Sequence, residues 1–298
     1  MNAADQSQHV PCDLCGSDDC EVYLEPRRMR SLAESDFTVL GEQGEHPRIV
    51  RCRVCGLIYA NPRDAAEGLV GKYKALPIAS YLQEESSRRL TASRDAAMLR
   101  RHVPPPARVL DVGCSAGLFL DCLGGDYERY GVEPGQESAA VARRLIGEAF
   151  IHNGTLDTAD FPAGSFDAIT MWDVVEHLVS PRQALLKTAS LLKSGGRLIV
   201  MTPDIGSLFA RILGHRWPHL IRSHIYYFTR PTLERMLGEC GFAVESWGTY
   251  SRRFTLRYLF QRAGLLKASP QTSSPGRKIG FTVPVNFFDA CLAIARKR

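Results

Sequence analysis

The sequence predicts an α/β protein built on a doubly wound, mainly parallel sheet and preceded by a small cysteine-rich module. Apolar, strand-like runs alternate with helix-prone segments between residues 105 and 250, and this alternation is typical of a parallel sheet with helices on both faces. A glycine-containing turn, Asp111–Gly117, joins the first strand of this region to its first helix. Five of the nine cysteines lie in the first 55 residues, which sets the N-terminal module apart from the α/β region.

The composition fits a globular protein with a sizeable core. Of the 298 residues, 45% are hydrophobic and 23% are charged, which is ordinary for such proteins. The net charge of +5 is modest and spread along the chain, so it gives little support for nucleic acid as a partner. The N-terminus is polar and no apolar run approaches the roughly 20 residues of a membrane span. We therefore expect a cytoplasmic protein whose cysteines are thiols or metal ligands.

The cysteine-rich module, residues 1–62, contains the motif C-x-x-C-G twice, at Cys12–Gly16 and at Cys52–Gly56. The two-residue gap lets both sulfurs of one motif reach the same ion, and two such motifs supply the four thiolates of a structural zinc site. Unligated thiols and redox chemistry are the alternative interpretations of these motifs. The predicted zinc ligands are Cys12, Cys15, Cys52 and Cys55.

The insert between the two motifs, residues 17–51, is longer than the usual ~15–20 residues, so we expect a hairpin or a loop to fill it. Cys20 and His46 lie within it as substitute metal ligands, but each lacks a paired neighbour. Three arginines of the insert form either a solvated basic loop or a contact with an anionic substrate: Arg27, Arg28 and Arg30.

The α/β region follows a charged, helix-prone connection, residues 63–104, which ends at Pro104–Pro106. Proline stops a helix because it lacks the backbone donor that a further turn requires. We expect the strands of the region at 108–112, 130–133, 149–152, 166–171 and 197–201, followed by two more at 242–249 and 289–295.

Two helices of the α/β region have clear start signals. One begins at Ser180, a capping residue that Pro181 follows in the first turn, and is expected to run to Lys193. The other begins after Thr229 and is expected to end at Gly241, because glycine commonly terminates helices.

The turn Asp111–Gly117 lies between a strand and a helix, and a second short strand ends in Glu133, about twenty residues further on. A strand, a glycine turn, a helix and then an acidic residue form a nucleotide-binding βαβ unit. Asp111 would repel a pyrophosphate on the turn, whereas it would attract a ligand that carries an amine and a sulfonium. This pattern predicts S-adenosylmethionine as the cofactor, with Glu133 accepting hydrogen bonds from the ribose hydroxyls.

The turn also resembles the D-x-G-C-G-x-G motif of class I S-adenosylmethionine-dependent methyltransferases, with Ser115 in place of the middle glycine. Gly154–Asp167 resembles the G-D-A-E-D-L-P-F-P-D-G-S-F-D stretch of that family. The usual acid beside the adenine is absent there, so Asp157 or a backbone group would bind the adenine amine. The resemblance covers about residues 105–250 and the closing strand, and it implies a seven-stranded Rossmann-like methyltransferase sheet. The cofactor contacts that it implies are made by Asp111, Gly113, Cys114, Gly117, Thr155 and Leu156.

The segment Cys52–Pro62, followed by such a domain, resembles bacterial methyltransferases of sugar and surface-glycan biosynthesis, including sugar C-methyltransferases. Gly214–Pro218 and His224–Thr229 resemble the same group. These resemblances imply methyl transfer to a small-molecule acceptor, namely a sugar or glycan precursor linked to a nucleotide or a lipid. One rival is an RNA methyltransferase with a zinc module, although the sequence lacks an N-P-P-Y-like base-clamping motif. The other rival is a cofactor-binding scaffold without enzymatic activity.

The strand expected at 166–171 ends in a segment that carries several chemically active side chains. Ligands bind at the carboxyl ends of strands in such sheets, so Trp172 and Asp173 are expected to line the cofactor. Glu176 and His177 have three interpretations: they brace the next helix, they form a catalytic base, or they bind a divalent cation. The third arises because the segment resembles the D/E-x-x-E-H segment of ubiquinone-pathway O-methyltransferases.

His224 precedes an aromatic run and follows a predicted lid, Leu208–Ile221. Methyl transfer requires that donor and acceptor lie in line and that the acceptor lose a proton. Histidine suits an O or N acceptor near neutral pH. The predicted catalytic residues are therefore His177 and His224, with packing roles as the alternative.

The C-terminal segment, residues 251–298, completes the predicted organisation. Its stretches 254–262 and 280–288 are aromatic and basic. We expect a lid or an oligomer contact there, followed by the closing strand. Contact with the inner face of a membrane, near a lipid-linked acceptor, is the alternative.

Overall fold

The computed structural model describes residues 7–27, 45–65, 84–256 and 281–298, together with Phe260 and single residues between 68 and 82. Its centre is a seven-stranded sheet. The strands of this sheet are β6 (Ala107–Val112), β7 (Tyr127–Glu133), β8 (Ile151–Asn153), β9 (Phe166–Trp172), β10 (Leu192–Pro203), β12 (Phe242–Thr249) and β15 (Ala290–Lys297).

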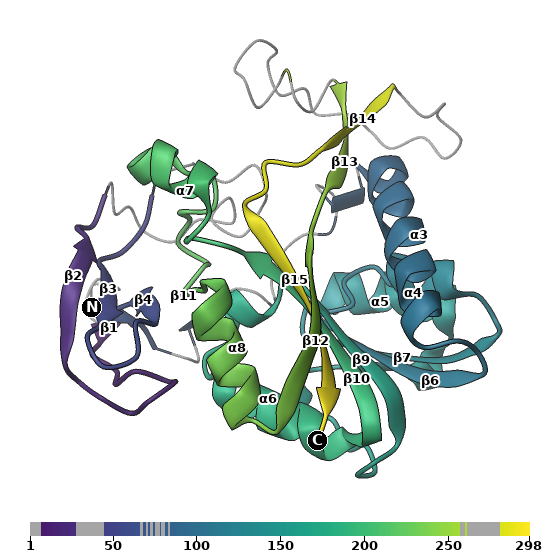
Figure 1. Cartoon of the computed structure of the whole chain (residues 1–298). Coiled ribbons are helices and arrows are strands. Elements are labelled where there is room, and N and C mark those ends of the chain that lie inside the picture. The colour runs from purple at the N-terminus through teal and green to yellow at the C-terminus, as the bar shows by residue number, and fades with distance from the viewer. Residues whose placement is uncertain are drawn as a thin grey trace.

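The strand order across this sheet is β12-β15-β10-β9-β6-β7-β8 (Figure 1). Neighbouring strands from β10 to β8 are parallel. Strand β15 lies antiparallel between β10 and β12. This is the doubly wound, mainly parallel, Rossmann-like sheet that the sequence predicts, so the predicted fold class is confirmed.

Helices cover both faces of the sheet (Figure 1). One face packs against α3 (Glu85–His102), α4 (Leu118–Leu123) and α5 (Gln136–Ile146). The other face packs against α6 (Pro181–Leu191) and α8 (Arg230–Glu239). Because successive side chains of a strand point to opposite faces, Val109 of β6 lies in the first of these cores and Leu110 lies in the second. Burial on both faces explains why the central strands are apolar along their length.

Helix α6 begins where the sequence predicts but ends earlier. The Ser180 hydroxyl accepts a hydrogen bond from a first-turn backbone amide at 3.3 Å, as expected of a capping residue. The helix ends at Leu191 rather than at Lys193, because Leu192 already pairs with Phe166 of β9. Pairing in the sheet therefore overrides the local helix signal at this end.

The cysteine-rich module forms a small sheet that includes one strand from the α/β region. The strands of this four-stranded sheet are β2 (Cys20–Leu24), β3 (Ile49–Cys52), β4 (Ile58–Ala60) and β11 (Tyr226–Tyr227), in the order β11-β4-β3-β2. A further antiparallel pair consists of β1 (Ser7–Gln8) and β5 (Arg63–Asp64). Leu57 and Tyr59 of the module are buried in the same core as α6 and α8. The module is therefore joined to the rest of the protein by backbone hydrogen bonds and by a shared core.

The C-terminal segment contributes β13 (Arg252–Thr255) and β14 (Thr282–Val285), an antiparallel pair that extends beyond the central sheet (Figure 1). Phe281, Phe287 and Phe288 are exposed in this segment. Contact of these residues with a membrane surface stays a prediction. In the described parts of the chain, no helix combines the length and the apolarity that a membrane crossing requires.

Two further sequence predictions concern the lid and the insert. Helix α7 (Leu208–Leu213) lies within the segment predicted as a lid. Strands β2 and β3 occupy the described ends of the insert between the cysteine motifs. Arg28 and Arg30 lie outside the described residues.

Candidate active site

The turn after β6 needs glycine at two positions. Gly113 and Gly117 have φ angles of +74° and +77°, a region that favours glycine. A Cβ on Gly113 would lie 2.6 Å from the Cγ2 of Val174. A Cβ on Gly117 would lie 3.1 Å from the Cβ of Ala142. The glycines thus let the turn pack against helix α5 and against the segment that follows β9.

Two residues inside the turn depart from a simple glycine loop. Ser115 has a φ of 48°, so the position of the family's middle glycine is strained by a side chain here. The Ser115 amide donates to the Oε2 of Glu133 at 2.9 Å. Cys114 is buried, and a Cβ on Gly131 of β7 would lie 2.6 Å from its sulfur. The thiol of Cys114 therefore faces the core, and the cofactor contact predicted for this residue would involve its backbone.

Two buried carboxylates lie at the ends of β6 and β7. Asp111 is 2% exposed and accepts a hydrogen bond from the Thr170 hydroxyl at 2.6 Å. Glu133 is 1% exposed, and its Oε1 accepts from the Gly135 amide at 2.7 Å. Burial raises the pKa of Asp111 to about 8 and also raises the pKa of Glu133. Because burial disfavours both negative charges, this corner of the protein favours a cationic ligand.

The residues expected beside the adenine lie at the next strand ends. Thr155 caps the short 3-10 helix Leu156–Thr158, and Leu156 is buried. Trp172 ends β9 and packs edge-on against Phe119 of α4, with ring centroids 5.4 Å apart. Among the residues that the structure describes, the buried indole N–H of Trp172 has no hydrogen-bond partner. Buried donors are almost always satisfied, so a ligand atom that accepts this bond fits the site.

Two further residues, Tyr81 and Arg88, lie beside the turn and were not predicted from the sequence. The guanidinium carbon of Arg88 lies 4.0 Å from the centre of the Tyr81 ring. A side-chain hydrogen bond with Ser115 connects Tyr81 to the turn. The Nε of Arg88 is buried, and no residue in the described part of the chain accepts a hydrogen bond from it. An arginine with a free donor can bind the carboxylate of an amino-acid ligand. Residues 63–104 carry no motif, so only the tertiary structure identifies this pair.

Asp173 follows β9 and has a φ of 53°. Its carboxylate forms an ion pair with Arg252 at the start of β13. Arg252 was not predicted from the sequence, because it lies 79 residues from Asp173 in a segment without a motif. The ion pair brings the C-terminal segment to the strand ends. The predicted cofactor contact of Asp173 stays a prediction.

The two predicted catalytic histidines lie side by side, with the ring centroids of His177 and His224 4.6 Å apart. The Nδ1 of His177 lies 2.8 Å from the Ser223 carbonyl oxygen. The Nδ1 of His224 lies 2.9 Å from the His219 carbonyl oxygen. Because a carbonyl only accepts, each Nδ1 carries the proton and each Nε2 carries a lone pair. Burial lowers the pKa of both imidazoles, so both are neutral bases at pH 7.

Glu176 lies beside the histidine pair and is 1% exposed. Its Oε2 accepts from the Thr202 hydroxyl at 3.0 Å, whereas its Oε1 is buried and has no partner within the described ranges. Burial raises the pKa of Glu176 to about 8, and the nearby charge of Asp173 adds to this effect. One carboxylate oxygen of Glu176 and one ring nitrogen each of His177 and His224 lie within 4.8 Å of one another. This arrangement suits acid–base chemistry and is also a donor set for a divalent cation.

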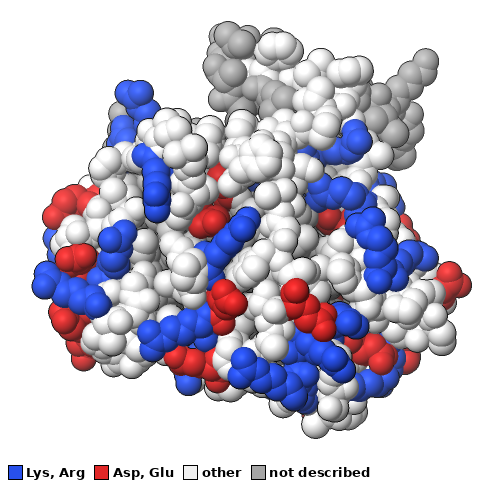
Figure 2. All heavy atoms as spheres, viewed as in Figure 1, with Lys and Arg blue, Asp and Glu red and all other residues white. Residues whose placement is uncertain are grey.

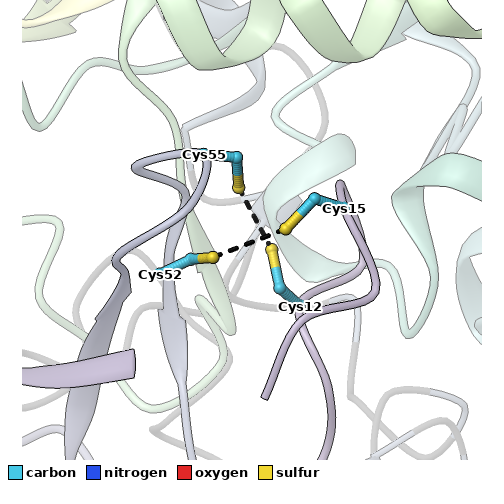
Figure 3. Close-up of side chains that lie close together, drawn as sticks. All are labelled: Cys12, Cys15, Cys52 and Cys55. Atoms are coloured by element: carbon cyan, nitrogen blue, oxygen red, sulfur yellow. Dashed lines mark hydrogen bonds between the residues drawn. The ribbon is translucent and has the colours of Figure 1, made fainter. Parts of the chain in front are cut away.

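The four predicted zinc ligands converge on one point (Figure 3). The sulfurs of Cys12 and Cys55 are 3.3 Å apart, and those of Cys15 and Cys52 are 3.5 Å apart. Sulfurs bound tetrahedrally at a zinc–sulfur distance of ~2.3 Å lie about 3.8 Å from one another. Four cysteine sulfurs at this spacing fit one zinc ion.

The two C-x-x-C-G motifs form the same backbone turn. The amides of Gly16 and Gly56 donate to the carbonyls of Cys12 and Cys52, at 2.7 and 2.9 Å. Both glycines have a positive φ, which explains the glycine at the end of each motif.

The two substitute metal ligands lie elsewhere. Cys20 stands opposite Cys52 in the β2–β3 pair. His46 stacks on His215, with ring centroids 6.1 Å apart. Neither belongs to the group of four sulfurs.

Known proteins resemble the part of the chain that contains the glycine turn and most of the central sheet. A family profile described as a methyltransferase domain matches residues 82–247, which is more than half of the chain. The chain belongs to this methyltransferase family. It is an S-adenosylmethionine-dependent methyltransferase, and its glycine turn and strand order are those expected for the class.

The methyltransferase also has curated relatives that match over part of their length. The ubiquinone biosynthesis O-methyltransferase of Xanthomonas axonopodis pv. citri (strain 306) is 37% identical over 107 residues, which are 33% of this chain and 44% of the relative. The protein of the same name from Xanthomonas campestris pv. campestris (strain B100) is 37% identical over 106 residues, again 33% of this chain and 44% of the relative. The match thus spans less than half the length of these relatives.

Among solved structures, the [4+2]-cyclase SpnF superposes with a TM-score of 0.50 and 20% sequence identity. The superposition covers 69% of this methyltransferase and 80% of the cyclase. At this level of identity the likeness shows the fold alone, because one fold hosts many activities.

Proposed function

We propose that this methyltransferase acts on a sugar or surface-glycan precursor, and that His177 or His224 removes the acceptor proton. The observation that carries this proposal is the histidine pair, in which backbone carbonyls fix both Nδ1 atoms and leave both Nε2 atoms as acceptors. A neutral imidazole is well suited to accept a proton near pH 7. The resemblance of the segment around His224 to sugar methyltransferases supports this choice of acceptor.

S-adenosylmethionine, when bound, supplies a methyl group on a positively charged sulfur. We assign its cationic end to Asp111 and its ribose to Glu133, since burial of both carboxylates favours a cation beside the turn. The indole N–H of Trp172 and the Nε of Arg88, for which the described residues offer no partner, donate to polar atoms of the cofactor. The remaining assigned cofactor contacts are Gly113, Cys114, Gly117, Thr155, Leu156 and Asp173.

The polar surroundings of the histidine pair favour a hydroxyl-rich acceptor. The negative charge of Asp173 partly offsets the lowering of the His177 pKa by burial. The positive charge of Arg252 adds to the lowering of the His224 pKa by burial. An acceptor at the histidines therefore meets hydrogen-bonding groups, which provide specificity in small-molecule sites. Figure 2 shows acidic and basic residues interspersed over one face of the molecule. Such a face gives no support to the RNA methyltransferase alternative.

We assign one structural zinc ion to the four cysteines of the module, residues 1–62. The spacing of the sulfurs and the matching turns of the two motifs support this assignment. The division that we propose continues with a helical connection at 63–104, the cofactor-binding domain at 105–250, and a lid with the closing strand at 251–298.

A second candidate function is that of an O-methyltransferase that requires a divalent cation. The group of Glu176, His177 and His224 favours it, because the donor atoms lie within 4.8 Å of one another. Metal-binding histidines usually donate their other ring N–H to a carbonyl or carboxylate, as both histidines do here. The curated relatives are named ubiquinone biosynthesis O-methyltransferases, which points in the same direction. A cation held there would supply Lewis-acid polarisation of the acceptor hydroxyl.

The proposal is tested with nucleotide-linked sugars and a catechol as acceptor probes, in metal-free buffer and with added Mg²⁺. Release of S-adenosylhomocysteine measures turnover, and calorimetry measures cofactor affinity. We expect a sugar probe to be methylated without added metal. In His177→Ala or His224→Ala, turnover should fall by about 10²–10⁴, the usual contribution of a general base, with unchanged cofactor affinity.

His102→Ala is the matched control, because His102 lies at the end of α3. It should retain full turnover. Methylation of the catechol alone, and only with Mg²⁺, would favour the second candidate instead. Equal loss of cofactor affinity in both active-site histidine variants would contradict the base assignment.

A further inference from the structure

The cysteine-rich module contacts both chain segments that carry the histidine pair. Its first motif reaches the segment after His177. The Oδ1 of Asp13, in the middle of that motif, accepts from the Ser180 hydroxyl at 2.8 Å, and its Oδ2 accepts from the Arg182 amide at 2.8 Å. Asp13 therefore caps helix α6, which begins shortly after His177.

The second motif reaches the segment that carries His224. Strand β4, which follows Cys55, pairs with β11 in an antiparallel arrangement. The Ala60 amide donates to the Ile225 carbonyl at 2.9 Å. Ile225 directly follows His224 in the sequence, so β4 holds the backbone beside this histidine.

Arg63 of β5 joins the two segments to each other. It is 7% exposed. Its Nη1 donates to the Tyr226 hydroxyl at 3.0 Å, and its Nη2 donates to the Val179 carbonyl at 2.9 Å. One planar guanidinium thus spans from the chain after His224 to the chain after His177, a geometry that arginine suits because its donors are fixed.

The four cysteines would link these contacts through one ion. Each close sulfur pair, Cys12 with Cys55 and Cys15 with Cys52, joins one motif to the other. The sulfurs of Cys12 and Cys52 belong to the same buried core as Tyr226. A change in the distance between the two motifs should therefore change the distance between the two segments that carry the histidines.

We propose that the zinc module, together with Arg63 directly after it, is a positioning element of the active site, in which Asp13 and Arg63 are positioning residues that set the mutual placement of His177 and His224. This inference rests on the proposed function, in which the histidines act on the acceptor. Asp13 and Arg63 then affect turnover through the segments that carry the two histidines. A displacement of about 1 Å at a catalytic group can lower turnover by about 10²-fold, so a small change in the module is sufficient for a measurable effect.

The test uses the full chain with zinc bound and records the histidine ring signals by NMR after ¹⁵N-histidine labelling. His177→Gln and His224→Gln assign the two signals. Asp13→Ala removes the cap on α6, whereas Asp13→Asn retains an acceptor oxygen. Asp18→Ala is the control, because Asp18 is exposed in the same module.

A second pair of variants tests the bridge between the segments. Arg63→Met removes both of its hydrogen bonds. Arg53→Met is its control, because Arg53 is exposed and forms surface ion pairs with Asp19 and Glu21. Arg63→Lys is a milder change that retains the charge but loses the fixed fork of donors.

We expect Asp13→Ala and Arg63→Met to retain one zinc ion per chain and to bind S-adenosylmethionine with a Kd within about twofold of the unmodified protein. The ring signals of both active-site histidines should move in these variants and remain in place in the two controls. With the sugar probe, kcat should fall by about tenfold or more, with a smaller change in KM. Asp13→Asn should recover most of the loss.

Unmoved ring signals in both variants, with zinc retained, would overturn the positioning role. A loss of cofactor affinity as large as the loss of kcat would do the same, because it would indicate general destabilisation. If Arg63→Met fails to fold, Arg63→Lys decides the matter, and unmoved signals there overturn the proposal. Full turnover in the histidine-to-alanine variants would contradict only the assignment of a histidine as the base. The positioning proposal would stand, since the ring signals report the placement of the histidines independently of activity.

Discussion

The cofactor side and the histidine side of this molecule are assembled differently. On the cofactor side, the glycine turn Asp111–Gly117 and the carboxylate of Glu133 belong to one continuous βαβ unit. On the histidine side, residues from distant parts of the chain meet: Asp13 and residues 60–63, residues 176–182 and residues 223–227. The first arrangement depends on local geometry, whereas the second depends on contacts that form only when the whole chain folds.

This difference has a consequence for mutagenesis. A βαβ unit fixes its ligand-binding groups through a strand, a turn and a helix that adjoin one another. The histidine side lacks such a local framework and depends on the cysteine-rich module. Substitutions on one side should therefore change the properties of that side and leave the other largely unaffected.

The largest effect is expected from the loss of a zinc ligand. Cys52→Ser should release the metal and lower the free energy of unfolding by more than about 4 kcal/mol, because the module shares its core with α6 and α8. Elemental analysis and thermal denaturation measure these two changes. Cys122→Ser is the control, because Cys122 lies outside the sulfur cluster, and it should leave the zinc bound. Equal zinc content in the two variants would contradict the ligand assignment.

The cofactor side should respond most strongly to loss of Glu133. Glu133→Ala should weaken S-adenosylmethionine binding by about 1.5–3 kcal/mol, the typical contribution of hydrogen bonds to a charged group. Calorimetry measures this change, and the zinc content should stay the same. Glu128→Ala, on the same strand and exposed, serves as the control and should bind normally. Unchanged affinity in Glu133→Ala would remove the ribose assignment.

Cofactor affinity should also depend on pH through Asp111. Burial raises the pKa of this carboxyl to about 8, and the charge of Glu133 adds to this effect, so the ligand-free protein holds the carboxyl mainly protonated at pH 7. A bound cation favours the charged form, lowers this pKa and releases the proton. Affinity should therefore rise from about pH 6 to about pH 8, by at most about tenfold per pH unit, and then level off.

Calorimetry across this pH range measures the dependence. Asp111→Asn should abolish the rise, which separates the carboxyl from the titration of the amino group of the cofactor itself. A rise that persists in Asp111→Asn would show that another group is responsible.

The smallest expected effect concerns the strained position in the turn. Ser115 has a φ of 48°, so Ser115→Gly should relieve strain and stabilise the protein by up to about 1 kcal/mol. Urea denaturation measures the change. Ser93→Gly, at an exposed position within α3, provides the contrast and should destabilise by about 0.5 kcal/mol because glycine is a poor helix former. Destabilisation by Ser115→Gly would show that the serine side chain contributes more than its backbone strain costs.

The sequence by itself determined the features whose geometry is local. The α/β alternation predicted the central sheet, and the glycines at 113 and 117 marked the turn because only residues without Cβ fit there. The two C-x-x-C-G motifs predicted a convergence of four sulfurs, which the structure contains. Each motif is only a few residues long, although the two cysteine motifs that converge lie 37 to 43 positions apart. The roles assigned to the site residues and the division into domains stay predictions.

Only the tertiary structure decided which side chains meet across the chain. The end of α6 at Leu191 follows from strand pairing with β9. The partners of Asp111 and Asp173, namely Thr170 and Arg252, come from other strands. The cap that Asp13 places on α6 joins residues 167 positions apart. Such contacts leave no periodic signal in the sequence, because a buried polar group is satisfied by whichever partner the folded chain brings beside it.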